Sequence, residues 1–171
     1  FPDYRPFIDG RYIFSGLLAE IDEAQRDPGL WRAFMDRRGI GLVLTENDGL
    51  ILRYPGEPVG RPYAAYAWQK SEWALVYWDS DAIVLVRRSA VARRWLAEHE
   101  YRWIRPHDLH EVGLYVVAGV VPLRTVAGEI ERYRREIGDP RETLILTSWL
   151  DSFAKGLTPE TGAAGRSSRP R

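Results

Sequence analysis

Three residues near the start of the chain have side chains suited to bind a charged ligand. Asp9, Gly10 and Arg11 end an apolar run that begins at Arg5 and is predicted to be an extended strand. If this strand belongs to a parallel sheet, its end lies where open α/β sheets bind ligands. Gly10 permits a turn with positive φ, Asp9 accepts hydrogen bonds from hydroxyl groups, and the planar Arg11 guanidinium matches a phosphate or carboxylate. The combination suits a phosphorylated sugar; the alternative is an internal ion pair that fixes the end of the strand.

The histidines, of which the chain has three, offer a weaker possibility. His107 and His110, together with Asp108 and Glu111, supply nitrogen and oxygen ligands within five residues. Positions 107 and 110 share a helix face only if the helix has already begun at 107. Asp108 and Glu111 instead have the spacing of a capping box, which starts a helix at 108. We therefore predict neither a metal site nor a cofactor.

Aromatic residues concentrate between positions 54 and 78. They are Tyr54, Tyr63, Tyr66, Trp68, Trp73, Tyr77 and Trp78. Aromatic faces stack on sugars, but rings on a strand are more often core. Strand alternation puts Trp73, Leu75 and Tyr77 on one side of the strand, and Trp78 on the other. We assign most of these rings to the core and keep Tyr63 and Tyr66 as candidates for binding a glycan or a lipid headgroup.

Residues 1–105 have an α/β pattern that would position these candidates. A strand over 5–14, a helical pattern over 16–39 that restarts at Asp27 and Pro28, and an apolar strand over 40–45 form a βαβ unit. Its strands are expected to be parallel, and the second strand to be covered on both faces. The runs 73–78 and 82–87, separated by Asp79, Ser80 and Asp81, predict an antiparallel hairpin. We therefore expect a small mixed sheet with helices, parallel at its start and antiparallel at its end.

Residues 106–157 are predicted to be helical and to follow that α/β domain as an extension. Asp108 and Glu111, and likewise Asp139 and Glu142, have capping-box spacing, and helical apolar stripes run through 126–137 and 144–153. Ion pairs are expected between Glu131 and Arg135 and between Arg132 and Glu136. The two stripes predict an antiparallel helical hairpin, which resembles a repeat unit, with a possible third helix over 108–119. The Gly, Ser, Arg and Pro composition of residues 158–171 predicts a disordered tail.

Composition narrows the classes of function. Lys plus Arg equals Asp plus Glu at 24 each in 171 residues, so no overall charge attracts the chain to nucleic acid. The absence of cysteine excludes disulfides, thiolate zinc sites and cysteine nucleophiles. We find no Walker loop, no G-x-G-x-x-G, no G-x-S-x-G and no paired-histidine zinc motif. The basic cluster Arg87, Arg88, Arg93 and Arg94 is interpreted as a solvated helix edge or a contact with anionic lipid.

The succession of elements resembles the soluble C-terminal region of polytopic bacterial membrane proteins that look like C-type glycosyltransferases, which use lipid-linked sugars. The resemblance covers about residues 5–105 and rests on the segment Phe7 to Arg11, the helix leading to Trp31, the strand at 41–44 and the hairpin at 73–87. It implies that this chain lies at the extracytoplasmic face of the cell membrane, as part of a longer membrane protein. It also implies that the catalytic acids lie in an early loop between membrane helices, so we assign no catalytic residue here.

The resemblance implies a non-catalytic accessory domain that positions a glycan or a lipid-linked acceptor beside the membrane-embedded part of its own chain. One alternative is a protein-interaction module that binds its partner through residues 122–156. Another is a small enzyme that uses Asp9 and Arg11.

Overall fold

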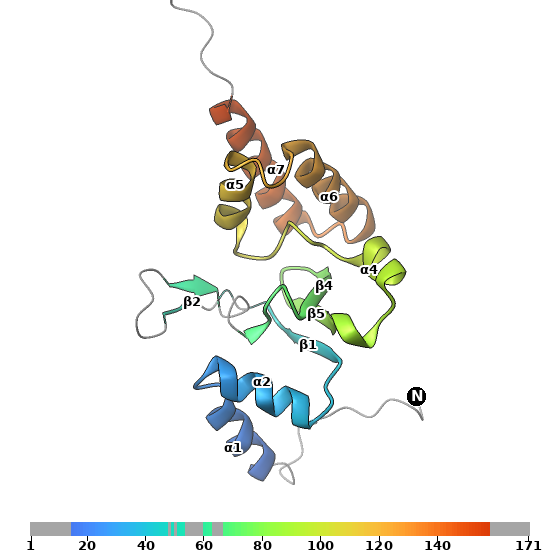
Figure 1. Cartoon of the computed structure of the whole chain (residues 1–171). Helices are drawn as coiled ribbons and strands as arrows, with labels where there is room; N and C mark the ends of the chain where they lie inside the picture. Colours follow the sequence, from blue (N-terminus) through green and yellow to red (C-terminus); the bar gives the residue numbers. More distant parts are fainter. Residues whose placement is uncertain (1–14, 48, 50, 54–59, 63–66, 158–171) are drawn as a thin grey trace, which may run out of the picture.

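The computed structural model describes residues 15–47, 49, 51–53, 60–62 and 67–157. In Figure 1, two helices lie at one end of the molecule, a sheet lies in the middle, and a group of helices lies at the other end. The elements in chain order are α1 (Ser15–Ala24), α2 (Pro28–Arg37), β1 (Leu42–Glu46), β2 (Ile51–Leu52), β3 (Arg61–Pro62), β4 (Trp73–Trp78), β5 (Ala82–Arg87), the 3-10 turn η2 (Arg88–Ala90), α4 (Arg93–His99), α5 (Leu109–Val117), α6 (Leu123–Glu136) and α7 (Pro140–Leu157). None of the described helices combines the length and the apolar character that a membrane span requires.

The α/β class is confirmed, but the described sheet is antiparallel throughout. Its strand order is β1-β5-β4, and β2 pairs with β3 in a separate two-stranded sheet. The expected parallel start is not found among the described strands, because β1 pairs with the returning strand of the hairpin. The predicted first strand, over residues 5–14, lies outside the described residues.

Strand β1 is not covered on both faces as its apolar sequence predicted. The side chains of Leu42 and Leu44 are 62% and 70% exposed, whereas Val43 packs against the core. On the outer face, Leu96 of the short helix α4 packs on Ala74 of β4 and Val86 of β5 and leaves Leu42 and Leu44 of β1 exposed. An edge strand that is covered on one side alternates between more and less exposed positions, and β1 alternates between exposed and half-buried residues.

A bulge in β4 changes which aromatic rings enter the core. The pairing with β5 shifts register between Leu75 and Tyr77. Because one extra residue reverses the alternation, Trp78 joins Trp73 and Leu75 in the main core, while Tyr77 turns outward. The predicted grouping of Tyr77 with Trp73 is therefore wrong beyond the bulge. At the same bulge, the carbonyl of Leu75 accepts a hydrogen bond of 2.7 Å from the backbone N–H of Tyr101.

Two of the predicted helix starts are confirmed by their caps. Asp27 Oδ1 accepts hydrogen bonds from the N–H groups of Gly29 and Leu30 at 2.7 and 3.0 Å. Asp139 Oδ1 accepts from the N–H groups of Arg141 and Glu142 at 2.9 and 3.1 Å. In both cases proline occupies the first helical position, where its missing N–H costs nothing.

Two other local predictions are wrong. Asp108 precedes α5 but makes no capping hydrogen bond with its side chain. Glu131 pairs with Arg134 at 2.8 Å, not with Arg135, whereas the pair of Arg132 with Glu136 is present at 3.6 Å.

One hydrophobic core connects the sheet to the helices on both sides. Trp68 contacts Trp31 of α2 and Trp73 of β4, with ring centroids 5.4 and 5.2 Å apart. Trp78 of β4 lies against Tyr133 of α6, with ring centroids 4.5 Å apart. The same cluster of buried side chains therefore extends from Ala24 in α1 to Leu146 in α7.

Candidate functional site

The side chains selected from the sequence are only partly described by the structure. The candidate ligand-binding residues Asp9, Arg11, Tyr63 and Tyr66 lie outside the described residues. His107 Nε2 lies 2.9 Å from Asn47 Oδ1, and neither His107 nor His110 approaches Asp108 and Glu111 as a fellow ligand. Within the described part of the chain, no group of three or more histidine and carboxylate side chains is placed to hold a metal ion.

The structure instead forms a groove between the sheet and the C-terminal helices. Two cavities of about 510 and 360 Å³ lie on either side of the segment 100–103 and share Glu100, Arg102 and Trp103 in their walls. We call them the larger and the smaller cavity. The larger cavity is also lined by Lys70, Ser71, Arg88, Tyr115 and Val120. The smaller cavity is also lined by Leu96, Ala97, Thr125, Gly128, Glu129 and Arg132.

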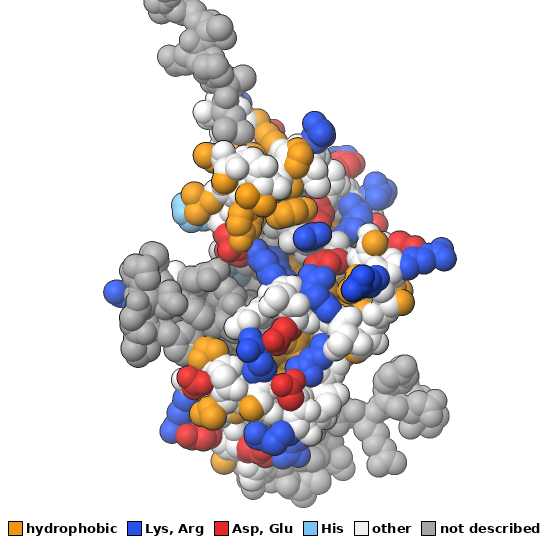
Figure 2. Space-filling model, in the orientation of Figure 1, with side chains coloured by type: hydrophobic (Ala, Val, Ile, Leu, Met, Phe, Trp, Pro, Cys, Tyr) orange, Lys and Arg blue, Asp and Glu red, His pale blue; other side chains and the backbone are white. Residues whose placement is uncertain are grey.

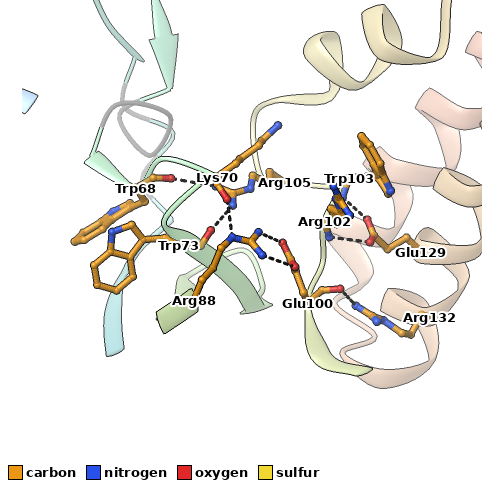
Figure 3. Close-up of polar contacts among 10 residues, drawn as sticks. All are labelled: Trp68, Lys70, Trp73, Arg88, Glu100, Arg102, Trp103, Arg105, Glu129 and Arg132. Carbon is orange, nitrogen blue, oxygen red and sulfur yellow. Dashed lines mark hydrogen bonds and ion pairs between the residues drawn. The ribbon is translucent and has the colours of Figure 1, made fainter. Parts of the chain in front are cut away.

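Glu129 fixes the segment that divides the groove. Its two carboxylate oxygens accept hydrogen bonds from the consecutive backbone N–H groups of Arg102, Trp103 and Ile104, at 2.8, 2.7 and 2.8 Å. Figure 3 shows the first two of these bonds. Burial raises the pKa of Glu129, although these three donors act in the opposite direction. Because the backbone is held from one side by α6, the side chains of Arg102 and Trp103 line the groove.

Hydrogen bonds from two arginines connect the turn η2 and helix α6 to this segment. The Arg88 guanidinium binds both carboxylate oxygens of Glu100 and donates to the carbonyl oxygen of Lys70 at 2.8 Å (Figure 3). Arg132 of α6 donates to the backbone carbonyl of Glu100 at 2.6 Å and lies over the ring of Tyr101, 4.1 Å from its centroid. The fork-to-fork geometry of Arg88 and Glu100 is the strongest form of ion pair, so it holds the wall of the groove in a fixed place.

Lys70 connects the wall of the larger cavity to the first turn of α5. Its Nζ lies 2.5 Å from Glu111 and 3.3 Å from Asp108, and the Tyr115 hydroxyl donates to Glu111 at 3.0 Å. Burial and the neighbouring Glu111 raise the pKa of Asp108 to about 6. Burial acts to raise the pKa of Glu111 as well, but hydrogen bonds from Asp108 and Lys70 outweigh it and lower that pKa to about 2. The carboxylate of Asp108 therefore interacts with Lys70 instead of capping helix α5.

Arg105 is buried, lines neither cavity and stabilises the fold. It is 7% exposed and donates to the backbone carbonyls of Trp68 at 3.3 Å and Trp73 at 3.0 Å (Figure 3). Burial lowers the pKa of Arg105 to about 10. These bonds attach the segment after Trp103 to the start of β4, which fixes the distance between the two sides of the groove.

Aromatic rings and cations stack along the groove. The Arg102 guanidinium lies 5.3 Å from the centroid of the Trp103 ring, and Trp103 meets Tyr115 edge to face at 6.2 Å. Lys70 lies 5.6 Å from the Tyr115 centroid. Aromatic rings beside N–H donors are suited to bind a polar ligand that also has a flat apolar face.

Most of the groove was not recognised from the sequence. Arg88 belonged to a basic cluster interpreted as solvated or in contact with lipid, which is wrong for two of its members: Arg88 pairs with Glu100, and Arg87 pairs with Asp36 and lies over Trp73. Glu129 is separated from its three partners by at least 25 residues, so no local spacing indicates it. The one available signal is the dipeptide Arg102-Trp103 directly before the predicted boundary near 105.

No protein-family model matches the chain, and no match to it was found among the curated proteins or the solved structures.

Proposed function

We propose that the chain is a non-catalytic accessory domain that holds a glycan or a lipid-linked acceptor in the groove between the sheet and helices α5 and α6. In this proposal it lies at the extracytoplasmic face of the cell membrane, as part of a longer glycosyltransferase-like membrane protein. The resemblance of residues 5–105 motivates the cellular setting. The binding role rests on one observation: Arg102 and Trp103 line both cavities, and Glu129 fixes their backbone through hydrogen bonds.

The charges of the groove favour binding over catalysis. The carboxylates that line it have internal partners: Glu100 binds Arg88, and Glu129 binds three backbone N–H groups. A general acid or base has to exchange a proton with the substrate, and a nucleophile needs an adjacent base. Carboxylates engaged in this way position side chains and leave substrate contact to the rings and to unused N–H donors.

Tryptophan substitution tests the proposal. Trp103→Ala should abolish the fluorescence change that an oligosaccharide panel produces in the wild-type protein, while thermal unfolding stays cooperative. Trp149→Ala is the matched control, because Trp149 stacks on Phe153 of α7 and lies outside both cavities. Equal saccharide binding by the wild type and by Trp103→Ala would refute the assignment of the groove. The cellular setting is tested separately by the upstream coding sequence, which should encode several hydrophobic spans before Phe1.

A protein-interaction module is the second candidate, and exposed apolar side chains favour it. On α7, Leu144 and Ile145 are 67% and 44% exposed; near the end of α5, Leu114, Val117 and Val120 are also exposed. Figure 2 shows hydrophobic side chains gathered at the end of the molecule formed by these helices. A pull-down whose partner is lost on replacing Leu144 and Ile145 by Ser, but kept on replacing Trp103 by Ala, would favour this candidate.

We also propose that residues 5–14 form the first strand and pair in parallel with β1. Among the described strands, β1 has a neighbour on one edge only, and its exposed Leu42 and Leu44 leave apolar surface for an added strand to cover. Removal of residues 1–14 should then increase hydrogen exchange at the β1 amides and leave β4 unchanged. Unaltered exchange in β1 would contradict the pairing.

A further inference from the structure

We propose that the ligand of the groove is an acidic saccharide, with its anionic substituent in the larger cavity and its neutral hydroxyl groups in the smaller one. This inference rests on the proposed binding function and adds the chemical class of the ligand. The walls of the two cavities differ in charge. The larger cavity is lined by three cations, Lys70, Arg88 and Arg102, and by one carboxylate, Glu100, while Glu111 and Asp108 pair with Lys70 without lining the cavity. In the smaller cavity two arginines are balanced by two glutamates.

Arg102 is the cation best placed to contact an anion. Its guanidinium makes no ion pair within the described part of the chain and lies 5.3 Å from the centroid of the Trp103 ring. The N–H donors of a guanidinium match the oxygens of a carboxylate or a phosphate. Since Arg102 lines both cavities, an anion bound to it would lie beside the dividing segment.

Lys70 and Arg88 add donors to the same cavity although both are paired. Lys70 uses two N–H groups on Glu111 and Asp108, and an ammonium has three. Arg88 uses three on Glu100 and the Lys70 carbonyl, out of five on a guanidinium. In Figure 2, Lys and Arg side chains gather across the middle of the molecule, below the apolar side chains of the helical end. The larger cavity therefore offers several N–H donors at one place.

The smaller cavity has the features that a neutral sugar ring requires. Thr125 contributes a hydroxyl group, which can both donate and accept a hydrogen bond. A Cβ built on Gly128 would meet nothing within 4 Å, so the helix surface is open there. Each cavity falls within the roughly 300–1,000 Å³ typical of small-molecule sites. Together they can hold a short oligosaccharide across the Trp103 ring.

The test compares an acidic trisaccharide with its own neutral ester. Trigalacturonate should bind the intact chain at low salt about tenfold or more tightly than its methyl ester, since a hydrogen bond to a charged partner is worth more than one to a neutral partner. Added salt should reduce the difference. Glucose 6-phosphate against glucose distinguishes phosphate from carboxylate as the source of the anion, and inorganic phosphate alone should bind weakly.

A charge-neutralising variant assigns the preference to the groove. Arg102→Gln should reduce trigalacturonate binding about tenfold and change methyl-ester binding little, whereas Arg134→Gln, on the exposed side of α6, should behave as wild type. If acid and ester bind equally to the wild type and Trp103→Ala abolishes both, this inference fails and the proposed function stands. If neither binds, both fail. If inorganic phosphate binds as tightly as glucose 6-phosphate, the site recognises a free anion and the saccharide assignment is overturned.

Discussion

The replacement Glu129→Gln tests whether one buried carboxylate positions the groove. In the native protein this carboxylate accepts three backbone N–H bonds, each between 2.7 and 2.8 Å. A glutamine has the same shape but presents an NH₂ group in place of one oxygen. At least one backbone N–H then loses its acceptor, and a buried donor without a partner costs about 1–3 kcal/mol. Burial raises the pKa of Glu129 because it makes the charged form costly. Glutamine carries no charge and avoids this cost, so we expect the loss in stability to lie within this range and not above it.

For a chain of this length, a loss of 1 kcal/mol lowers the melting temperature by about 2–4 °C. We therefore expect Glu129→Gln to melt roughly 2–12 °C below the wild type at neutral pH. Urea titration followed by tryptophan fluorescence gives the free energy of unfolding. Glu131→Gln, an exposed neighbour on α6 that pairs with Arg134, is the matched control and should change stability by about 0.5 kcal/mol or less. If the two variants unfold at the same urea concentration, Glu129 does not position the segment as described.

Four further substitutions test other parts of the structure. Because burial raises the folded-state pKa of Asp108 to about 6, ionisation of this carboxyl group costs the wild type stability as the pH rises toward neutrality; Asp108→Asn should therefore become more stable relative to the wild type between pH 4 and pH 7 in urea titrations. Gly113→Ala should lower the melting temperature, since its Cβ would lie 2.9 Å from the Phe153 ring, whereas Gly128→Ala, with open space, should raise the free energy of unfolding by about 0.5–1 kcal/mol. Tyr133→Phe should unfold at no lower temperature than the wild type, because the buried Tyr133 hydroxyl has no hydrogen-bond partner among the described residues; a clear loss would reveal one.

Local sequence signals predicted the elements whose formation depends on neighbours in the chain. The acid–proline starts at Asp27 and Asp139 were predictable because a cap and its N–H partners lie within three residues. The hairpin of β4 and β5 was predictable from its two apolar runs and the turn between them. Its bulge was not, because a register shift depends on how the strand meets Tyr101 and the core.

The strand order and the groove required information that local spacing does not contain. The apolar run at 40–45 has the composition of a strand buried on both faces, and only its position at the edge of the sheet explains the exposed Leu42 and Leu44. Asp108 has the spacing of a cap, but Lys70, 38 positions earlier, binds its carboxylate instead. Glu129 and Arg102 belong to different elements and become partners only when α6 packs beside the segment after α4.

The most direct measurement of the central claim is a titration of the indole N–H signals of the seven tryptophans in a ¹H–¹⁵N spectrum with trigalacturonate, followed by mass analysis of the recovered saccharide. The account predicts a saturable shift of the Trp103 signal, an unchanged Trp149 signal and a saccharide recovered with its original mass. An unmoved Trp103 signal, or a saccharide altered by the chain alone, would contradict a groove that binds its ligand without transforming it.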